Sequence, residues 1–159
     1  MNNIYIPKRE IIIPTGAVML TLRNVITGRI TRELYKNMFV TAGKNSLADH
    51  IRGTTANNKG IITYCALGTN STAPALGNTT LGTELARKLV SVRTVAANVA
   101  TFETFFTTAE AIGTLREAGL FGDDASATAD TGTLFCHVAI NRTKTSNDTL
   151  TLSWTVTIG

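Results

Sequence analysis

The C-terminal stretch 149–158 limits the fold of this chain more than any other segment. Hydroxyl side chains alternate there with apolar ones: Thr149, Thr151, Ser153, Thr155 and Thr157 against Leu150, Leu152, Trp154, Val156 and Ile158. An extended strand places alternate side chains on opposite faces, whereas a helix would mix the two sets. The pattern therefore predicts a strand with one hydroxylated face and one apolar face, which a second layer of the protein must cover.

Similar apolar segments, separated by turn-forming residues, recur along the 159 residues. We expect strands at 17–25, 29–34, 35–40, 61–67, 88–95, 99–107, 114–121, 133–140 and 149–158. A short helix is expected from an N-cap at Ser46 to Ile51, and residues 83–88 suit a single helical turn. Many short strands without alternating long helices predict an all-β fold, an antiparallel β-sandwich or barrel of jelly-roll-like type with one short helix.

Residues 1–15 are predicted to form an extended N-terminal arm, and residues 16–159 a single β domain. Pro7 and Pro14 prevent a continuous helix in the arm. Large apolar side chains there should be sheltered from water, either along an edge of the chain's own sheet or as a strand added to a neighbouring subunit. Together with Phe105, on the otherwise polar face of its strand, they are the candidate subunit or partner interface residues: Ile4, Tyr5, Ile6, Ile11, Ile12 and Ile13.

The composition favours protein contacts over nucleic acid or membrane. Charged residues make up 16% of the chain, against roughly 25% in average globular domains. Hydroxylated strand faces occur on ordinary monomers and equally at subunit interfaces, where burying a hydroxyl costs less than burying a charge. The net charge of +4 comes from 15 dispersed Lys and Arg residues, so direct nucleic-acid binding is not expected. No signal peptide or membrane-length apolar run is recognised.

The His and Asp residues form no familiar metal-binding pattern. His50 and His137 belong to no two-ligand motif, and a structural role is expected for both. Asp123, Asp124 and Asp130 lack the ligand spacing of a calcium loop and are expected to form a solvated acidic loop. We therefore assign no metal ligand and no cofactor.

The remaining reactive side chains also have simpler interpretations. Cys65 and Cys136 lie in apolar strand segments and are predicted to be buried thiols, although a bond between them stays open. Glu110 and Glu117 would form an acid/base pair only across a cleft, which nothing in the sequence marks. Cross-strand pairing of Arg116 or Glu117 with Glu84 or Arg87 is the simpler hypothesis. No catalytic residue is assigned, and the chain is predicted not to be an enzyme.

Three stretches taken together resemble a family of small structural proteins from tailed bacteriophages: Tyr64–Ala75, Glu84–Lys88 and Gly113–Phe121. Asn147–Ile158 and Asn37–Asn45 fit the same pattern, so the resemblance covers nearly the whole chain. It implies a virion component of the capsid surface or the tail, and it implies no catalytic residues.

Two classes of function follow. The first is a homo-oligomeric capsid decoration or cement protein, with a trimer favoured, that bridges capsomers and whose arm pairs with a neighbour. A tail, baseplate or fibre-associated protein belongs to the same class. Its partners would be the major capsid protein or other virion proteins, and it would reach the virion after synthesis in the host cytoplasm. The second class is a module that binds host-surface carbohydrate, although the 68–82 loop lacks the aromatic residues expected of such a site.

Overall fold

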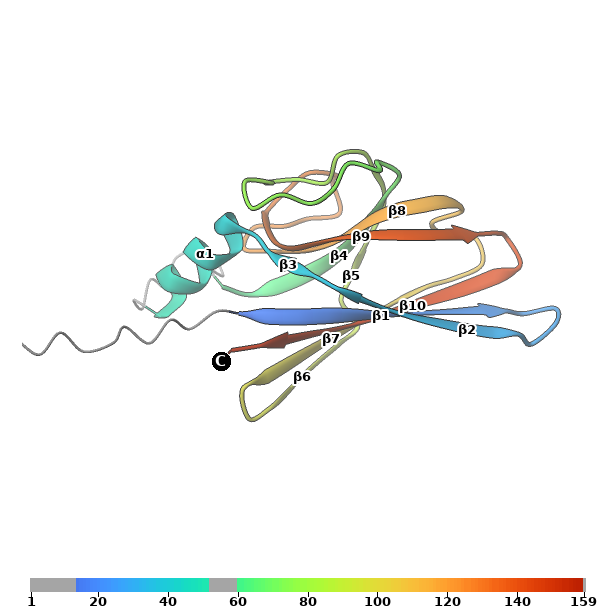
Figure 1. Cartoon of the computed structure of the whole chain (residues 1–159), viewed down its shortest axis with the longest axis horizontal. Helices are drawn as coiled ribbons and strands as arrows, with labels where there is room; N and C mark the ends of the chain where they lie inside the picture. The colour runs from blue at the N-terminus through green and yellow to red at the C-terminus, as the bar shows by residue number, and fades with distance from the viewer. Residues whose placement is uncertain (1–13, 52–59, 159) are drawn as a thin grey trace, which may run out of the picture.

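The computed structural model describes residues 14–51 and 60–158, which form two antiparallel sheets packed face to face (Figure 1). Sheet A consists of β1 (Thr15–Asn24), β2 (Ile30–Lys36), β6 (Val92–Ala96), β7 (Val99–Phe106) and β10 (Asp148–Thr157), in the order β2-β1-β10-β7-β6. Sheet B consists of β3 (Met38–Phe39), β4 (Ile62–Gly68), β5 (Glu84–Leu89), β8 (Gly113–Gly122) and β9 (Thr133–Lys144), in the order β3-β9-β8-β4-β5. One helix, α1 (Thr41–Ile51), lies beside β9. The predicted all-β sandwich is confirmed.

The C-terminal strand β10 lies at the centre of sheet A, between β1 and β7. Its apolar residues Leu150, Leu152 and Trp154 are fully buried, while the hydroxyl residues between them are only half-buried on the outer face. Val18 of β1 and Phe102 of β7 stand opposite Trp154 on either side. The alternation read from the sequence thus gives the inner and outer faces of the sheet correctly.

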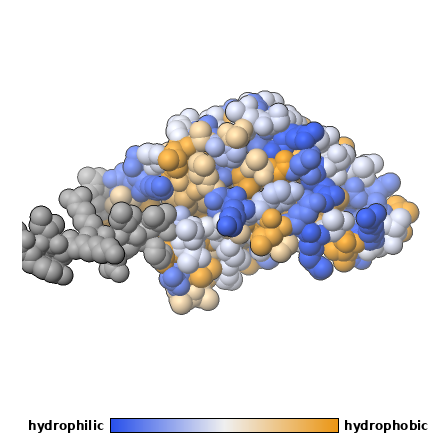
Figure 2. All heavy atoms as spheres, in the orientation of Figure 1, coloured by the Kyte–Doolittle hydropathy of each residue, from blue (hydrophilic) through white to orange (hydrophobic). Residues whose placement is uncertain are grey.

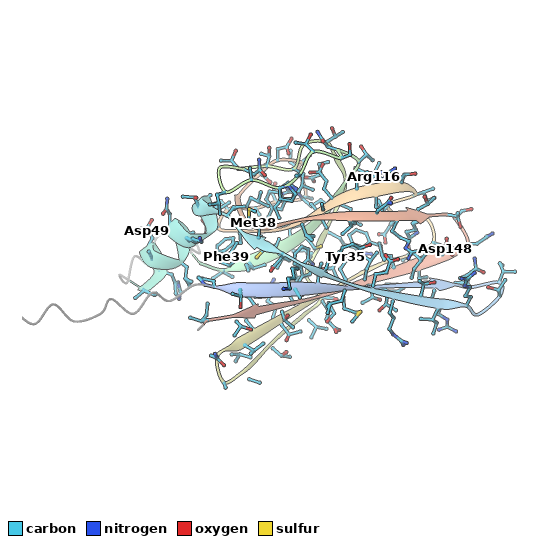
Figure 3. All side chains as sticks on the ribbon, in the orientation of Figure 1. Tyr35, Met38, Phe39, Asp49, Arg116 and Asp148 are labelled. Carbon is cyan, nitrogen blue, oxygen red and sulfur yellow. The ribbon has the colours of Figure 1, made fainter. Side chains whose placement is uncertain are left out.

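The main core fills the space between the inner faces of the two sheets. Sheet A contributes Trp154 and Phe106, and sheet B contributes Leu120 and Phe135. The two residues of β3 face opposite sides of sheet B (Figure 3). Phe39 belongs to the main core, and Met38 packs against a second apolar cluster on the other face.

The helix begins five residues earlier than the sequence suggested. Ser46 is not its N-cap but a buried residue in its middle. Gly43 also lies inside the helix, although glycine is a poor helix former. A Cβ at Gly43 would lie 2.5 Å from the Cα of Phe135. The glycine therefore lets the helix backbone approach β9 closely, and this contact outweighs the low helix propensity of glycine.

The segment 83–95 differs from the prediction because the chain changes sheets inside it. Residues 84–89 form strand β5 rather than a helical turn. The predicted strand 88–95 is divided between β5 in sheet B and β6 in sheet A. The Val90 N–H donates to Thr63 of β4, and the Ser91 N–H donates to Glu103 of β7. Consecutive residues are thus bonded to different sheets, which a propensity argument does not detect.

We predict that Gly43→Ala lowers the free energy of unfolding by about 1–3 kcal/mol, because the added methyl group forces the helix away from β9. Gly77→Ala is the matched control, since a Cβ at Gly77 meets no atom within 4 Å. Urea unfolding of both variants measures the difference. Equal stability of the two variants would contradict the close approach of α1 to β9.

Candidate functional site

The two outer faces of the sandwich differ. Above sheet B the loops 69–83 and 123–132 form a third layer (Figure 1). An apolar cluster fills the space between these loops and the sheet: Val40, Ala66, Leu81, Phe121 and Leu134. Within residues 14–51 and 60–158 no comparable cluster covers the outer face of sheet A. A polar pocket beneath the first loop and the bare face of sheet A are therefore the two candidate sites.

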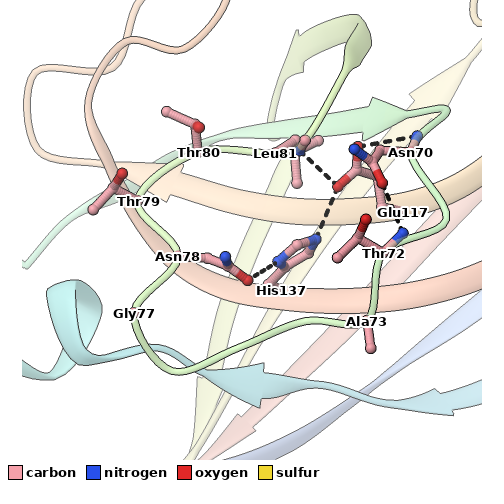
Figure 4. A pocket seen from close by; sticks show the side chains of 11 residues that line it. Asn70, Thr72, Ala73, Gly77, Asn78, Thr79, Thr80, Leu81, Glu117 and His137 are labelled. Carbon is pink, nitrogen blue, oxygen red and sulfur yellow. Dashed lines mark hydrogen bonds and ion pairs between the residues drawn. The ribbon is translucent and has the colours of Figure 1, made fainter.

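The polar pocket is built around the carboxylate of Glu117, a β8 residue whose side chain is almost fully buried (Figure 4). The carboxylate accepts backbone N–H bonds from Gly82 and Thr83, both at 2.9 Å, and from Asn70 at 3.3 Å. A buried carboxylate is stable when its oxygens accept several such bonds. Glu117 thereby ties both ends of the 69–83 loop to the centre of sheet B.

His137 of β9 completes this network. Its Nε2 lies 3.0 Å from Glu117 Oε2, and its Nδ1 lies 3.0 Å from Asn78 Oδ1. The same Asn78 oxygen accepts the Ala75 N–H at 2.7 Å, which fixes the orientation of the amide. Both ring nitrogens therefore face acceptors, and a neutral ring, which has one N–H, can donate to only one of them at a time. Burial lowers the pKa of His137 from its ordinary value of 6.5, while the hydrogen bond and the charge of Glu117 oppose this shift.

The pocket has a volume of about 260 Å³ and is lined mainly by amide and hydroxyl side chains, among them Asn70, Thr72 and Thr79. A catalytic dyad would need a nucleophile hydrogen-bonded to the histidine. Here Glu117 and Asn78 occupy the two ring nitrogens. This arrangement holds a loop in place, as expected from the structural role predicted for His137. The pairing of Glu117 with Glu84 or Arg87 was wrong, because Arg87 and Glu84 pair with each other.

The other reactive residues singled out from the sequence have structural environments. Cys65 and Cys136 are buried free thiols, and Leu120 stands between them in the register of sheet B. Burial raises the pKa of Cys65 to about 12, so this thiol is unreactive. Glu110 forms an ion pair with Lys88 at 2.7 Å and does not form an acid/base pair with Glu117. In the described part of the chain no group of three or more His, Cys, Asp or Glu residues has the arrangement of a metal site.

The acidic loop is only partly solvated, which corrects the expectation for Asp123. Its carboxylate is buried and accepts the Ser46 hydroxyl at 2.7 Å and the Gly60 N–H at 2.9 Å. It therefore connects helix α1 to the end of β8. Asp124 and Asp130 are exposed, as predicted.

The outer face of sheet A carries a central stripe of hydroxyl groups from β10, flanked by apolar side chains. One row across the five strands reads Leu34, Met19, Ser153, Glu103 and Val92. Leu34 is 66% exposed and Phe105, opposite Thr151, is 45% exposed. Figure 2 views the sandwich from its edge, where apolar residues lie among polar ones. The same face carries Arg23, Arg32, Lys36 and Glu103, so a protein surface that binds it would have to offer complementary charges.

The predicted interface residues thus separate into two groups. Phe105 lies on the bare face of sheet A. Ile4, Tyr5, Ile6, Ile11, Ile12 and Ile13 fall outside the described residues. Sequence reasoning missed the Glu117–His137–Asn78 network, because the 69–83 loop that buries Glu117 is distant from it in the sequence.

No family model, curated protein or solved structure matches this chain. Within residues 14–51 and 60–158, no helix has the length and apolar character needed to cross a bilayer. The functional argument therefore depends on the fold and on the surfaces that it leaves uncovered.

We predict that Glu117→Gln destabilises the fold by about 2–3 kcal/mol, because the new amide NH₂ faces backbone N–H donors and leaves one of them unsatisfied. Glu103→Gln serves as the control, since Glu103 lies on the outer face and accepts a single side-chain bond, from Ser153. Chemical denaturation measures both. A Glu117→Gln variant as stable as the control would show that the buried carboxylate is not needed to hold the loop.

Stability should also depend on pH through His137. The folded state holds the proton less tightly than the unfolded chain, so the free energy of unfolding falls as pH is lowered below about 6.5 and is insensitive to this group above it. The carboxylates with lowered pKa values, Glu110 and Asp148, titrate at more acidic pH. Urea unfolding between about pH 5.5 and 7.5 should therefore show that the free energy of unfolding depends less on pH for His137→Gln than for the parent. The same pH dependence in both proteins would contradict the lowered pKa of folded His137.

Proposed function

We propose that this chain is a non-enzymatic structural component of a tailed-phage virion, a decoration protein that binds the capsid surface and bridges adjacent capsomers. The observation that carries the proposal is the asymmetry of the sandwich. Loops cover the outer face of sheet B, whereas the outer face of sheet A is bare and carries exposed Leu34, Val92 and Phe105. Its partner would be the major capsid protein or another virion protein.

The chemistry of the bare face supports binding to protein. Its centre is the hydroxyl stripe of β10, and hydroxyls accept or donate hydrogen bonds in an interface at a lower desolvation cost than charges. The flanking apolar side chains supply area that is excluded from water. A capsid presents many equivalent sites, so modest contacts of this kind add up when an oligomer binds several of them at once.

The stretches that carry the resemblance to phage structural proteins also form one structural unit. Tyr64–Ala75, Glu84–Lys88 and Gly113–Phe121 contribute β4, β5 and β8, which are adjacent in sheet B. The bonds from Asn70 and Thr83 to Glu117 join the loop that these stretches flank. These three stretches build the covered half of the sandwich, and Asn147–Ile158, which fits the same pattern, forms β10 of sheet A. The resemblance therefore supports a common scaffold rather than a common active site.

Within the same class, the bare face would serve a tail, baseplate or fibre-associated protein in the same way. The polar pocket favours a second candidate, a module for host-surface carbohydrate, because amides and hydroxyls line it. Its lining residues include no Trp, Tyr or Phe on which a sugar ring could stack. We therefore place this function second.

The purified chain should rebind to virions from which it has been stripped, and Phe105→Asp should weaken this binding at least tenfold, or about 1.4 kcal/mol, because it introduces a charge into the interface. Ala127→Asp is the control, since Ala127 is exposed on a loop over the other sheet. Co-sedimentation with particles measures both. Failure of the parent chain to bind would contradict a virion role, and equal binding of the two variants would contradict the bare face as the contact.

A further inference from the structure

An apolar groove opens at one end of the sandwich, where the two sheets separate. Its volume is about 230 Å³. One wall consists of Phe102 and Val156 from sheet A, and the other of Ile62 and Phe135 from sheet B, with Leu47 of α1 at the rim. At roughly 30 Å³ for each water molecule, this volume would hold seven or eight waters with few polar partners. One or two branched aliphatic side chains suit it better.

The groove adjoins an unprotected sheet edge. Strand β6 pairs only with β7, and all five of its residues are exposed. Val95, 75% exposed, belongs to both the strand and the groove. Edge strands are usually protected by charges, proline or a bulge, and Arg93 is the one charged residue of β6. A strand added along β6 would place alternate side chains over the groove.

Two segments of the chain outside the described residues are available to fill the groove. Residues 52–59 adjoin it at Gly60, but they include no Val, Leu, Ile, Met or aromatic residue. Residues 1–13 include five isoleucines, three of them consecutive at Ile11–Ile13. The chemistry of the groove therefore matches the N-terminal arm.

The length of the N-terminal arm determines whether the groove can receive the arm of its own chain or only that of another copy. Thr15 is already paired with Thr157, and β10 and β7 separate β1 from β6. A strand paired along the free edge of β6 would therefore lie four strand spacings from β1, or about 19 Å. Ile11 is four residues from Thr15 and reaches about 14 Å only when fully extended. A chain cannot lay its own Ile11–Ile13 along its own β6.

From these observations we infer that residues Ile11–Ile13 of a second copy of this chain pair along the free edge of β6 and insert isoleucine side chains into the groove. Each copy then donates one arm and receives another, which is a heterologous contact and closes into a ring when the rotation permits. The inference rests on the assembly role of the arm in the proposed function and names the surface that receives it. The contact between copies can be measured without a capsid. The inference can therefore be contradicted even if the protein binds phage particles.

Disulfide trapping tests the inference with full-length purified protein. Ile12→Cys and Val95→Cys are made as separate variants, mixed and oxidised, and a cross-linked dimer is expected on a non-reducing gel. The native Cys65 and Cys136 are buried and should not interfere. The control mixture replaces Val95→Cys with Thr27→Cys, an exposed position in the turn that follows the far end of β1. A single chain that carries both Ile12→Cys and Val95→Cys should form cross-linked oligomers.

Two results would overturn the inference. The first is a mixture that cross-links no more than the Thr27→Cys control. The second is a double variant that closes as a monomer with an internal disulfide, which would mean that the arm folds onto its own body. As an independent readout, Val95→Asp should weaken self-association at least tenfold in analytical ultracentrifugation, and Thr27→Asp should leave it unchanged. Equal association of these two variants would also contradict the inference.

Discussion

The packing of the apolar face of β10 against sheet B is the interaction on which the rest of the structure depends. Leu150, Leu152 and Trp154 are completely buried there. Full burial of a large apolar side chain contributes about 1.5–3 kcal/mol, as an upper estimate, because the unfolded chain is itself partly collapsed. Once these side chains face inward, the strict alternation of the strand places every hydroxyl of β10 on the outer surface. The core thus determines the character of the bare face.

The polar network around Glu117 then determines which outer face of the sandwich a loop covers and which stays exposed. A carboxylate in the middle of a strand, facing away from the main core, would be an ordinary surface residue. Here the 69–83 loop folds over it and provides three N–H donors, and His137 provides a fourth. The loop covers sheet B because its backbone amides satisfy a buried charge, and its apolar Leu81 packs beneath it. On the outer face of sheet A the carboxylate of Glu103 is only half-buried and accepts the Ser153 hydroxyl, and no described loop covers it.

The sequence allowed the strands and their faces to be predicted wherever the period of two was long and uninterrupted, as in β10 and β7. It failed where tertiary contacts override local preference. Gly43 looks like a helix breaker but permits close packing on β9, and residues 88–95 look like one strand but change sheets at Val90. The site was harder to predict because it is non-local. Glu117 and His137 are 20 residues apart, and Ser46 and Asp123 are 77 apart, so their pairing depends on strand register and loop path.

A virion reconstruction that resolves individual strands tests the central claim most directly, namely that the bare face of sheet A is the contact surface and the loop-covered face is not. The account predicts density for the sandwich on the particle with the hydroxyl stripe of β10 and Phe105 facing the underlying shell, and the 69–83 loop turned toward solvent. Density with the loops against the shell and sheet A facing solvent would contradict it, as would a particle that lacks this protein.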